Sequence, residues 1–242
     1  DGVIVSHNVH FFGIGESEME YRLRDYMERL TNPTLAPYAK QGECLVRVTA
    51  KAPTREAAEE MMKPVIERVL AEFGDLAYAV DGANLAEFTV RRLLEEGVTL
   101  ACAESCTGGE LQKRVTDIPG ASAALLGGVV VYTNEAKERL LGVPHELLEE
   151  KGAVSREVAA ELARRVREKL GSDLGVGITG LAGPDGDGVH EVGTVFISLA
   201  DGSDVWVREI HVPGRGRAGV RLYACQHALD MIRRRLGGLS VG

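Results

Sequence analysis

Residues 98–118 read VTLACAESCTGGELQKRVTDI, an apolar run followed by polar residues, two glycines and an amphipathic segment. The apolar run predicts a strand that ends at Glu104 and Ser105, and the segment from Gly108 onward predicts a helix. A strand that leads directly into a helix is the repeating unit of α/β proteins. This stretch therefore predicts an α/β fold with reactive side chains at the junction.

The same alternation extends over the C-terminal part of the chain, residues 83–242. The apolar patterns predict further strands at 124–133, 174–180, 193–200 and 204–212, and helices at 85–97, 134–143, 155–170 and 217–236. The last two strands flank the turn DGSD and read as a hairpin. We therefore expect an α/β sandwich with a mixed sheet.

Residues 1–82 have a different order of elements. Helical spacing predicts helices at 16–30 and 54–74, the second capped by Thr54, stopped near Gly74 and carrying Pro64 inside. Alternating apolar residues predict a strand at 43–52, and a short strand at 76–80 follows the second helix. The proline-rich stretch 32–43 reads as a loop. This order describes a small α+β domain.

Composition limits the function classes. The chain has 242 residues, 26% of them charged, with a formal net charge of -8 and a pI near 5.4. This acidic balance argues against a general nucleic-acid binder and against a binder of anionic membrane surfaces. The chain has no apolar run of about 20 residues and no signal peptide.

The cysteines indicate the cellular setting, and the first residues indicate how the chain originates. The four cysteines form no CxxC pair, so reduced thiols in a cytoplasm are expected. The chain starts DGVIVSHN without an initiator Met, which favours a fragment or a processed piece of a longer protein.

Reactive side chains follow three of the predicted strands. In open α/β sheets, ligands bind beyond the carboxyl ends of the strands. If these strands are neighbours, the side chains line one pocket with two hydroxyls, a phenol and an amine. They are Ser105, Tyr132, Lys137 and Thr179.

Ser105 is the candidate nucleophile, and a serine hydroxyl needs a base within hydrogen-bond reach. A desolvated Lys137 or a polarised Tyr132 could serve, and backbone N–H groups at the start of the following helix could stabilise an oxyanion. The alternative is a purely structural role in which Ser105 caps that helix, but Thr107 is the better cap. Cys106 is a second candidate nucleophile, although a buried, inert thiol is the commoner role.

Other chemistries have weaker support in the sequence. His190 and His211 are candidates for a Ser-His-Asp triad, and Asp185 with Asp187 could hold a cation or form a turn. No HExxH or His/Cys cluster indicates a metal. Three arginines close together could clamp a phosphate or simply be solvated: Arg215, Arg217 and Arg221.

The ordered motifs AESCTGG, GGVVVYTNEAK, GITGLAGPDG and the late RxxxR stretch together resemble the CinA C-terminal domain, the nicotinamide-nucleotide amidohydrolase family. The resemblance covers about residues 85–237. Upstream, GIGESEME, NPTLAPYAK and VRVTAKA resemble the KH-like middle domain of that family. We therefore expect a KH-like domain at 1–82 and the amidohydrolase domain at 83–242. Family members usually carry a further N-terminal domain that hydrolyses ADP-ribose, and that activity is not expected here.

The resemblance implies hydrolysis of the carboxamide of nicotinamide mononucleotide to nicotinic acid mononucleotide and ammonia, without a cofactor or metal. The family's catalytic residues fall on Ser105, Lys137 and Tyr132, with Thr179 beside them. The family's arginine falls on Arg217, and Arg215 could exchange roles with it. The remaining residues expected to contact substrate are Glu104, Thr107, Gly108, Gly109, Asn134, Gly180 and Gly183.

Two other functions stay open. One is a regulatory module that binds a nucleotide without cleaving it. The other is a DNA- or RNA-linked adaptor, suggested by the family's competence-related name and by the KH-like half. Nucleic-acid binding is not expected, because the acidic balance opposes it and the KH-like half has no GxxG clamp. A homodimer is expected only as the commonest state of a soluble enzyme.

Overall fold

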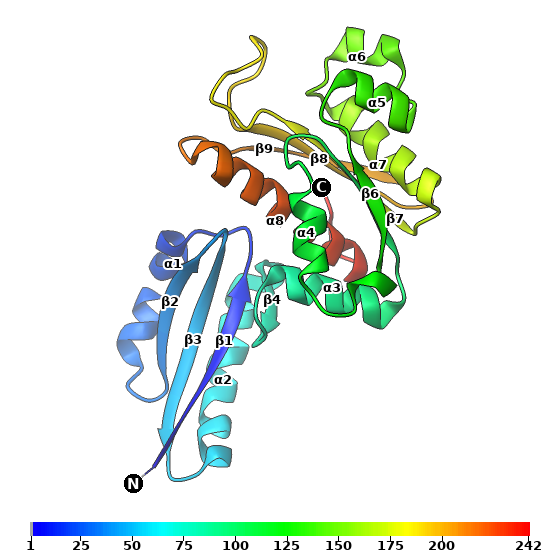
Figure 1. Cartoon of the computed structure of the whole chain (residues 1–242). Coiled ribbons are helices and arrows are strands. Elements are labelled where there is room, and N and C mark those ends of the chain that lie inside the picture. The colour runs from blue at the N-terminus through cyan, green and yellow to red at the C-terminus, as the bar shows by residue number, and fades with distance from the viewer. Residues whose placement is uncertain (1) are drawn as a thin grey trace. The chain divides into compact units, whose positions relative to one another are not determined.

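A computed structural model describes residues 2–242, which divide into two compact units (Figure 1). The first unit runs to Phe88 and the second is Thr89–Gly242. The division falls within helix α3 (Leu85–Glu96), a few residues beyond the 82/83 boundary expected from the sequence. The mixed α/β architecture expected from the sequence is confirmed.

The first unit is an antiparallel sheet in the order β2-β3-β1-β4, against which two helices pack (Figure 1). Apolar side chains of the strands and helices form its core, among them Val9, Val46 and Met62. Its elements are β1 (Val3–Phe11), α1 (Glu16–Arg29), β2 (Thr34–Lys40), β3 (Glu43–Ala52), α2 (Arg55–Phe73), a 3-10 turn (Gly74–Leu76) and β4 (Ala77–Val80).

The prediction of a loop at 32–43 is wrong, because β2 occupies most of it. Pro37 has no N–H to donate to a sheet, but β2 is an edge strand, where a missing donor is tolerated. Strand β1 was also not expected, since polar Ser6 and Asn8 interrupt its apolar pattern. The cap of α2 is confirmed: Thr54 Oγ1 accepts a hydrogen bond from the Ala57 amide at 3.2 Å.

The second unit contains a five-stranded mixed sheet in the order β6-β5-β7-β8-β9. Strands β6, β5 and β7 are parallel, whereas β8 and β9 run antiparallel as the expected hairpin. Its elements after α3 are β5 (Leu100–Glu104), α4 (Glu110–Thr116), a 3-10 turn (Ala121–Ala123), β6 (Leu125–Val130), α5 (Asn134–Leu141), α6 (His145–Lys151), α7 (Arg156–Leu170), β7 (Leu174–Gly180), β8 (Thr194–Ala200), β9 (Val205–His211) and α8 (Gly216–Leu236).

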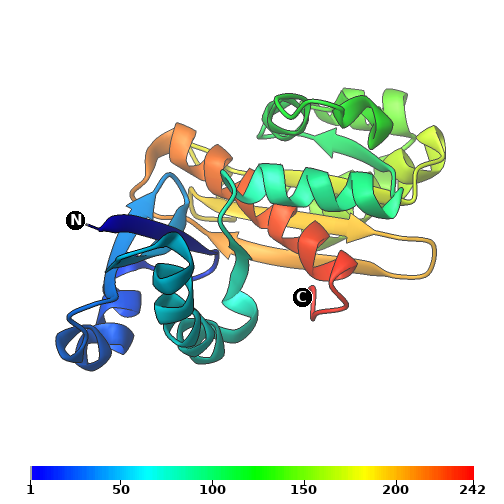
Figure 2. The same ribbon diagram turned by 90° about the horizontal axis from the view of Figure 1, so that it is seen from below.

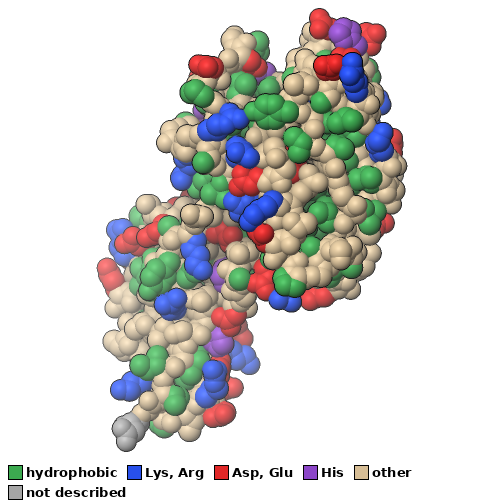
Figure 3. Space-filling view, viewed as in Figure 1, with side chains coloured by type: hydrophobic (Ala, Val, Ile, Leu, Met, Phe, Trp, Pro, Cys, Tyr) green, Lys and Arg blue, Asp and Glu red, His purple; other side chains and the backbone are tan. Residues whose placement is uncertain are grey.

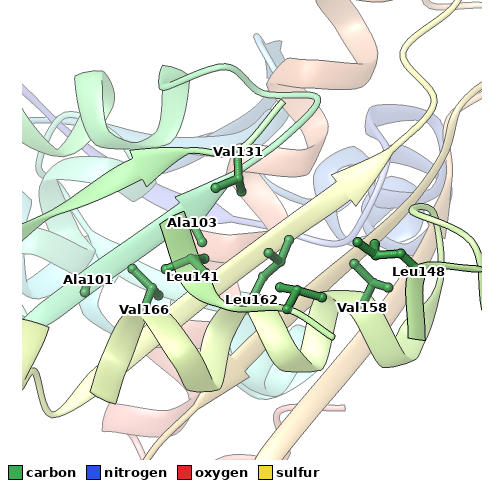
Figure 4. Close-up of a cluster of buried hydrophobic side chains, with 9 residues drawn as sticks. Ala101, Ala103, Val131, Leu141, Leu148, Val158, Leu162 and Val166 are labelled. Carbon is green, nitrogen blue, oxygen red and sulfur yellow. The ribbon is translucent and has the colours of Figure 1, made fainter. Parts of the chain in front are cut away.

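Helices cover both faces of this sheet (Figure 2). On one face α4 and α8 pack together, and α3 joins them through a hydrogen bond from Thr89 Oγ1 to the Leu229 carbonyl. On the other face α7 crosses the strands, with α5 and α6 beside it. A cluster of aliphatic side chains fills the space between α7 and the sheet (Figure 4), and includes Ala103, Val131 and Leu162.

Two local predictions in this unit need correction. The helix expected from Gly108 begins at Glu110, because Gly108 and Gly109 have φ values of +58° and +97° and form a tight turn. Thr107 is not the cap, since its buried Oγ1 has no hydrogen-bond partner among residues 2–242. Helix α6 was not expected from the sequence.

Candidate active site

The sheet order brings the ends of three strands to one edge. Strand β5 lies between β6 and β7, and both neighbours run parallel to it. The Ser105 amide donates to the Ile178 carbonyl at 2.9 Å, and the Val131 amide donates to the Glu104 carbonyl at 2.9 Å. The residues that follow the three strands therefore meet.

Ser105 and Lys137 are in direct contact. Lys137 Nζ donates hydrogen bonds to Ser105 Oγ at 3.2 Å and to the Val131 carbonyl at 3.0 Å. Lys137 lies in the first turn of α5, which begins after Thr133 caps it through the Ala136 amide. The side chains are almost inaccessible, with 8% of Ser105 and 1% of Lys137 exposed.

Burial changes the protonation of this lysine. Desolvation lowers the pKa of Lys137 from 10.5 to about 8, and no carboxylate forms a hydrogen bond or ion pair with it among the described residues. An amine with this pKa exists partly in the neutral form near neutral pH. It can therefore take a proton from the hydroxyl beside it.

Cys106 does not fit the role of nucleophile. Its side chain is 5% exposed, and burial raises the pKa of the thiol to about 12. The thiolate, not the thiol, is the nucleophilic form. The structure therefore favours the buried, inert reading of Cys106.

A cavity of about 220 Å³ opens beside Ser105 and Lys137. It collects residues from the ends of β5, β6 and β7, from the loop after β7 and from α8. The lining residues are Ser105, Cys106, Tyr132, Lys137, Ala153, Val154, Thr179, Gly180, Leu181, Ala182, Gly183, Asp185 and Arg217.

Arg217 spans the mouth of this cavity. It donates to the Gly183 carbonyl at 2.8 Å and to the Tyr132 phenol oxygen at 2.7 Å. Arg215 instead lies over the ring of Tyr223, with its guanidinium carbon 4.6 Å from the ring centre. Of the two arginines left open by the sequence, Arg217 lines the cavity.

Tyr132 does not reach Ser105, for which it was a candidate base. Its side chain is 55% exposed, and its phenol is hydrogen-bonded to Arg217 rather than to Lys137 or Ser105. Strand β6 ends at Val130, so Tyr132 follows the strand and turns outward. This tyrosine belongs to the mouth of the cavity.

Thr179 is buried at the end of β7. Its hydroxyl donates to the Ala153 carbonyl at 2.6 Å, in the loop before α7. A hydroxyl that donates one hydrogen bond keeps lone pairs that can accept others. Thr179 therefore offers the cavity an acceptor.

Several predicted contact residues lie elsewhere. Asn134 and Arg215 are outside the cavity lining, and so are four residues at or before the start of α4: Glu104, Thr107, Gly108 and Gly109. Successive side chains of a strand point to opposite faces of the sheet, so Glu104 points away from Ser105. Both oxygens of its carboxylate accept hydrogen bonds from α4. Gly108 and Gly109 line a separate groove with Arg221.

Asp185 also lines the cavity, whereas its sequence context left it either as a cation ligand or as part of a turn. It has no hydrogen bond or ion pair within residues 2–242, whereas its neighbour Asp187 accepts from the Val189 and His190 amides and holds the loop. No group of three or more His, Cys, Asp or Glu side chains that could hold a metal exists in the described part of the chain. His190 pairs with Asp187, and neither it nor His211 lines the cavity.

Comparisons with known proteins identify the family of the chain. Residues 82–236 match the family described as CinA C-terminal domain, and residues 6–79 match the family described as damage-inducible protein CinA KH domain. The chain belongs to the CinA family. A "CinA-like protein" of Desulfovibrio desulfuricans is 49% identical over 243 residues, covering 99% of this chain and 57% of that relative.

A "putative competence-damage inducible protein" of Bacillus subtilis is 41% identical, covering 95% of this chain and 55% of its own length. The chain thus spans little more than half of these relatives. A solved CinA superfamily protein of Klebsiella pneumoniae has 28% identity and a TM-score of 0.62, covering 64% of this chain and 96% of that one. The competence/damage inducible protein CihA of Agrobacterium tumefaciens has 34% identity and a TM-score of 0.60, covering 64% and 97%.

No helix within residues 2–242 combines the length and the apolar character that a membrane crossing needs. On the face drawn in Figure 3, acidic and basic side chains are interspersed rather than gathered by sign.

Proposed function

We propose that the second unit hydrolyses the carboxamide of nicotinamide mononucleotide, releasing ammonia and nicotinic acid mononucleotide. The contact between Ser105 Oγ and the buried Lys137 Nζ carries this proposal, because it pairs a nucleophile with an amine of lowered pKa. The resemblance to the nicotinamide-nucleotide amidohydrolases supports the choice of substrate.

In the first half of the reaction, Ser105 Oγ attacks the carboxamide carbon while neutral Lys137 takes the hydroxyl proton. The tetrahedral intermediate then collapses: its C–N bond breaks, and Lys137 returns the proton to the departing nitrogen, which leaves as ammonia. In the second half, water attacks the ester with Lys137 as base, and the C–Oγ bond breaks. The serine regains its proton and the acid is released.

Thr179 supports recognition of an amide. Because its hydrogen points to the Ala153 carbonyl, its oxygen is left as an acceptor for the N–H of the substrate carboxamide. A carboxylate product has no N–H to donate, so this contact favours the substrate over the product.

Asp185 and Arg217 support recognition of the nucleotide part. The Asp185 carboxylate, which has no partner among residues 2–242, can accept hydrogen bonds from the hydroxyls of a ribose, as acidic residues do in dinucleotide sites. Arg217 uses part of its guanidinium on Gly183 and Tyr132, and its remaining N–H groups can bind a phosphate.

The test is an ammonia-release assay with nicotinamide mononucleotide, its riboside and free nicotinamide. We expect release from the nucleotide, with kcat/KM rising with pH through about 8 because the base must be neutral. Ser105→Ala and Lys137→Arg should each lower turnover by about 10³-fold or more, with folded structure retained by circular dichroism.

Cys106→Ala is the control and should keep most of the activity. Loss of activity in Cys106→Ala with retention in Ser105→Ala would overturn the nucleophile assignment. Binding of the nucleotide without any ammonia release would instead favour a regulatory module.

A further inference from the structure

The turn that carries the nucleophile, residues 105–109, is held from behind by a buried carboxylate. Glu104 is fully buried, and its two oxygens accept from the Leu111 amide at 2.8 Å and the Gln112 amide at 3.1 Å. The Gln112 side-chain amide adds a third hydrogen bond at 2.8 Å. The carboxylate thereby ties the last residue of β5 to the first turn of α4.

An arginine holds the same turn from α8. Arg221 donates from Nη2 to the Thr107 carbonyl at 2.9 Å. The same nitrogen lies 3.5 Å from where a Cβ on Gly108 would stand, so the guanidinium lies close against the turn. Glu104 and Arg221 reach the turn from the α4 and α8 side of the sheet, whereas Lys137 reaches Ser105 from the α5 side.

This double attachment determines which backbone groups face the cavity. The Ser105 carbonyl accepts from the Gly108 amide at 3.0 Å, and so it points into the turn. In a trans peptide the N–H points opposite to the C=O, so the Cys106 amide points out of the turn. That amide donates to no other residue within 2–242, and Cys106 lines the cavity beside Ser105.

We infer that Glu104 and Arg221 are positioning residues that hold the turn. They keep Ser105 Oγ facing Lys137, and they keep the Cys106 amide facing the substrate carboxamide oxygen, which becomes negative in the reaction. The inference rests on the proposed function. An amide aimed at a developing oxyanion acts in the transition state and less in the ground state. Loosening the turn should therefore lower kcat far more than it raises KM.

The variants are Glu104→Gln and Arg221→Gln. Glutamine keeps the size of Glu104, but it cannot accept from three donors, because one of its own terminal groups is a donor. We expect each variant to lose about 10²-fold in kcat with KM changed by less than about threefold. The rise of activity through about pH 8 should stay in place, since neither residue contacts Lys137. Arg221→Lys, which keeps a donor, should recover part of the loss.

Matched controls lie at the other end of the same sheet. The Asp173 carboxylate accepts from the Thr99 amide and hydroxyl just before β5, and Arg167 donates to the Asp173 carbonyl at 3.0 Å. Asp173→Ala and Arg167→Gln therefore remove the same kinds of contact far from the cavity. They should lower stability while leaving kcat within about twofold. Equal kcat losses in controls and variants, or full kcat in both variants, would contradict the inference.

A second readout separates this inference from the proposed substrate. Diisopropyl fluorophosphate forms an Oγ–P bond with an activated serine and releases fluoride, and its P=O needs the same oxyanion contact. If wild type releases no ammonia, the proposed function fails. Slower labelling of Ser105 in both variants than in the controls would still support the positioning role of Glu104 and Arg221. Absence of labelling in wild type, or equal rates in all proteins, would overturn it.

Discussion

At the residue scale, the burial of the Lys137 amine serves catalysis but lowers the stability of the fold. Its amine is buried, and within residues 2–242 its only hydrogen-bond partners are a serine hydroxyl and a backbone carbonyl. A buried ammonium costs free energy unless a carboxylate pairs with it, so the fold favours the neutral amine that catalysis needs.

This conflict predicts a pH-dependent stability. Between pH 8 and 10.5 the unfolded chain holds a proton on Lys137 that the folded chain has lost, so stability rises with pH over this window. The unfolding free energy of wild type relative to Lys137→Met should therefore increase by about 3 kcal/mol between pH 7.5 and 10.5.

Urea denaturation of both proteins over this pH range measures the difference. Lys113→Met, which removes the same charge from an exposed side chain, is the control. A pH-independent difference for Lys137→Met would mean that the folded protein accommodates the ammonium.

At the scale of elements, α7 packs unusually close to β7. A Cβ added to Gly177 would lie 2.4 Å from the Ala159 carbonyl oxygen and 2.6 Å from the Ala163 nitrogen, and one on Gly175 would meet the same helix. These glycines alternate with Val176 and Ile178, so one face of β7 is bare where the helix backbone passes.

Gly177→Ala should therefore destabilise the protein strongly. The neighbours are backbone atoms that cannot rotate away, and the expected loss is about 3 kcal/mol in the free energy of urea unfolding. Gly186→Ala, in the loop after β7 with its nearest neighbour at 3.4 Å, is the matched control and should change stability by less than about 0.5 kcal/mol. An equally small change for Gly177→Ala would show that α7 shifts readily.

Sequence patterns predicted most elements because their causes are local. Ser155 accepts from the Val158 amide and starts α7 where expected, and Thr54 does the same for α2. The failures have non-local causes. Pro37 sits in a strand because that strand is at an edge of the sheet. Thr107 does not cap α4, because Glu104 from the preceding strand accepts from the Leu111 and Gln112 amides of the first turn.

At the scale of the whole molecule, every residue that lines the candidate cavity comes from the second unit. The solved relatives from Klebsiella pneumoniae and Agrobacterium tumefaciens match 64% of this chain and 96–97% of their own length. The second unit makes up about the same share of this chain. Residues 83–242 expressed alone should therefore fold and release ammonia with a kcat within about threefold of the whole chain. A folded but inactive 83–242 fragment would mean that the first unit contributes to catalysis.

The sequence by itself determined most strands and helices of the second unit, and it put hydroxyl, phenol and amine groups at strand ends, because hydrophobic periodicity and capping act over a few residues. Only the tertiary structure decided which of those groups meet. Adjacent Glu104 and Ser105 point to opposite faces of the sheet, and Arg217 rather than Arg215 reaches the cavity. These choices depend on contacts between elements distant in the chain, such as the 32-residue separation of Ser105 and Lys137, and no local pattern encodes them.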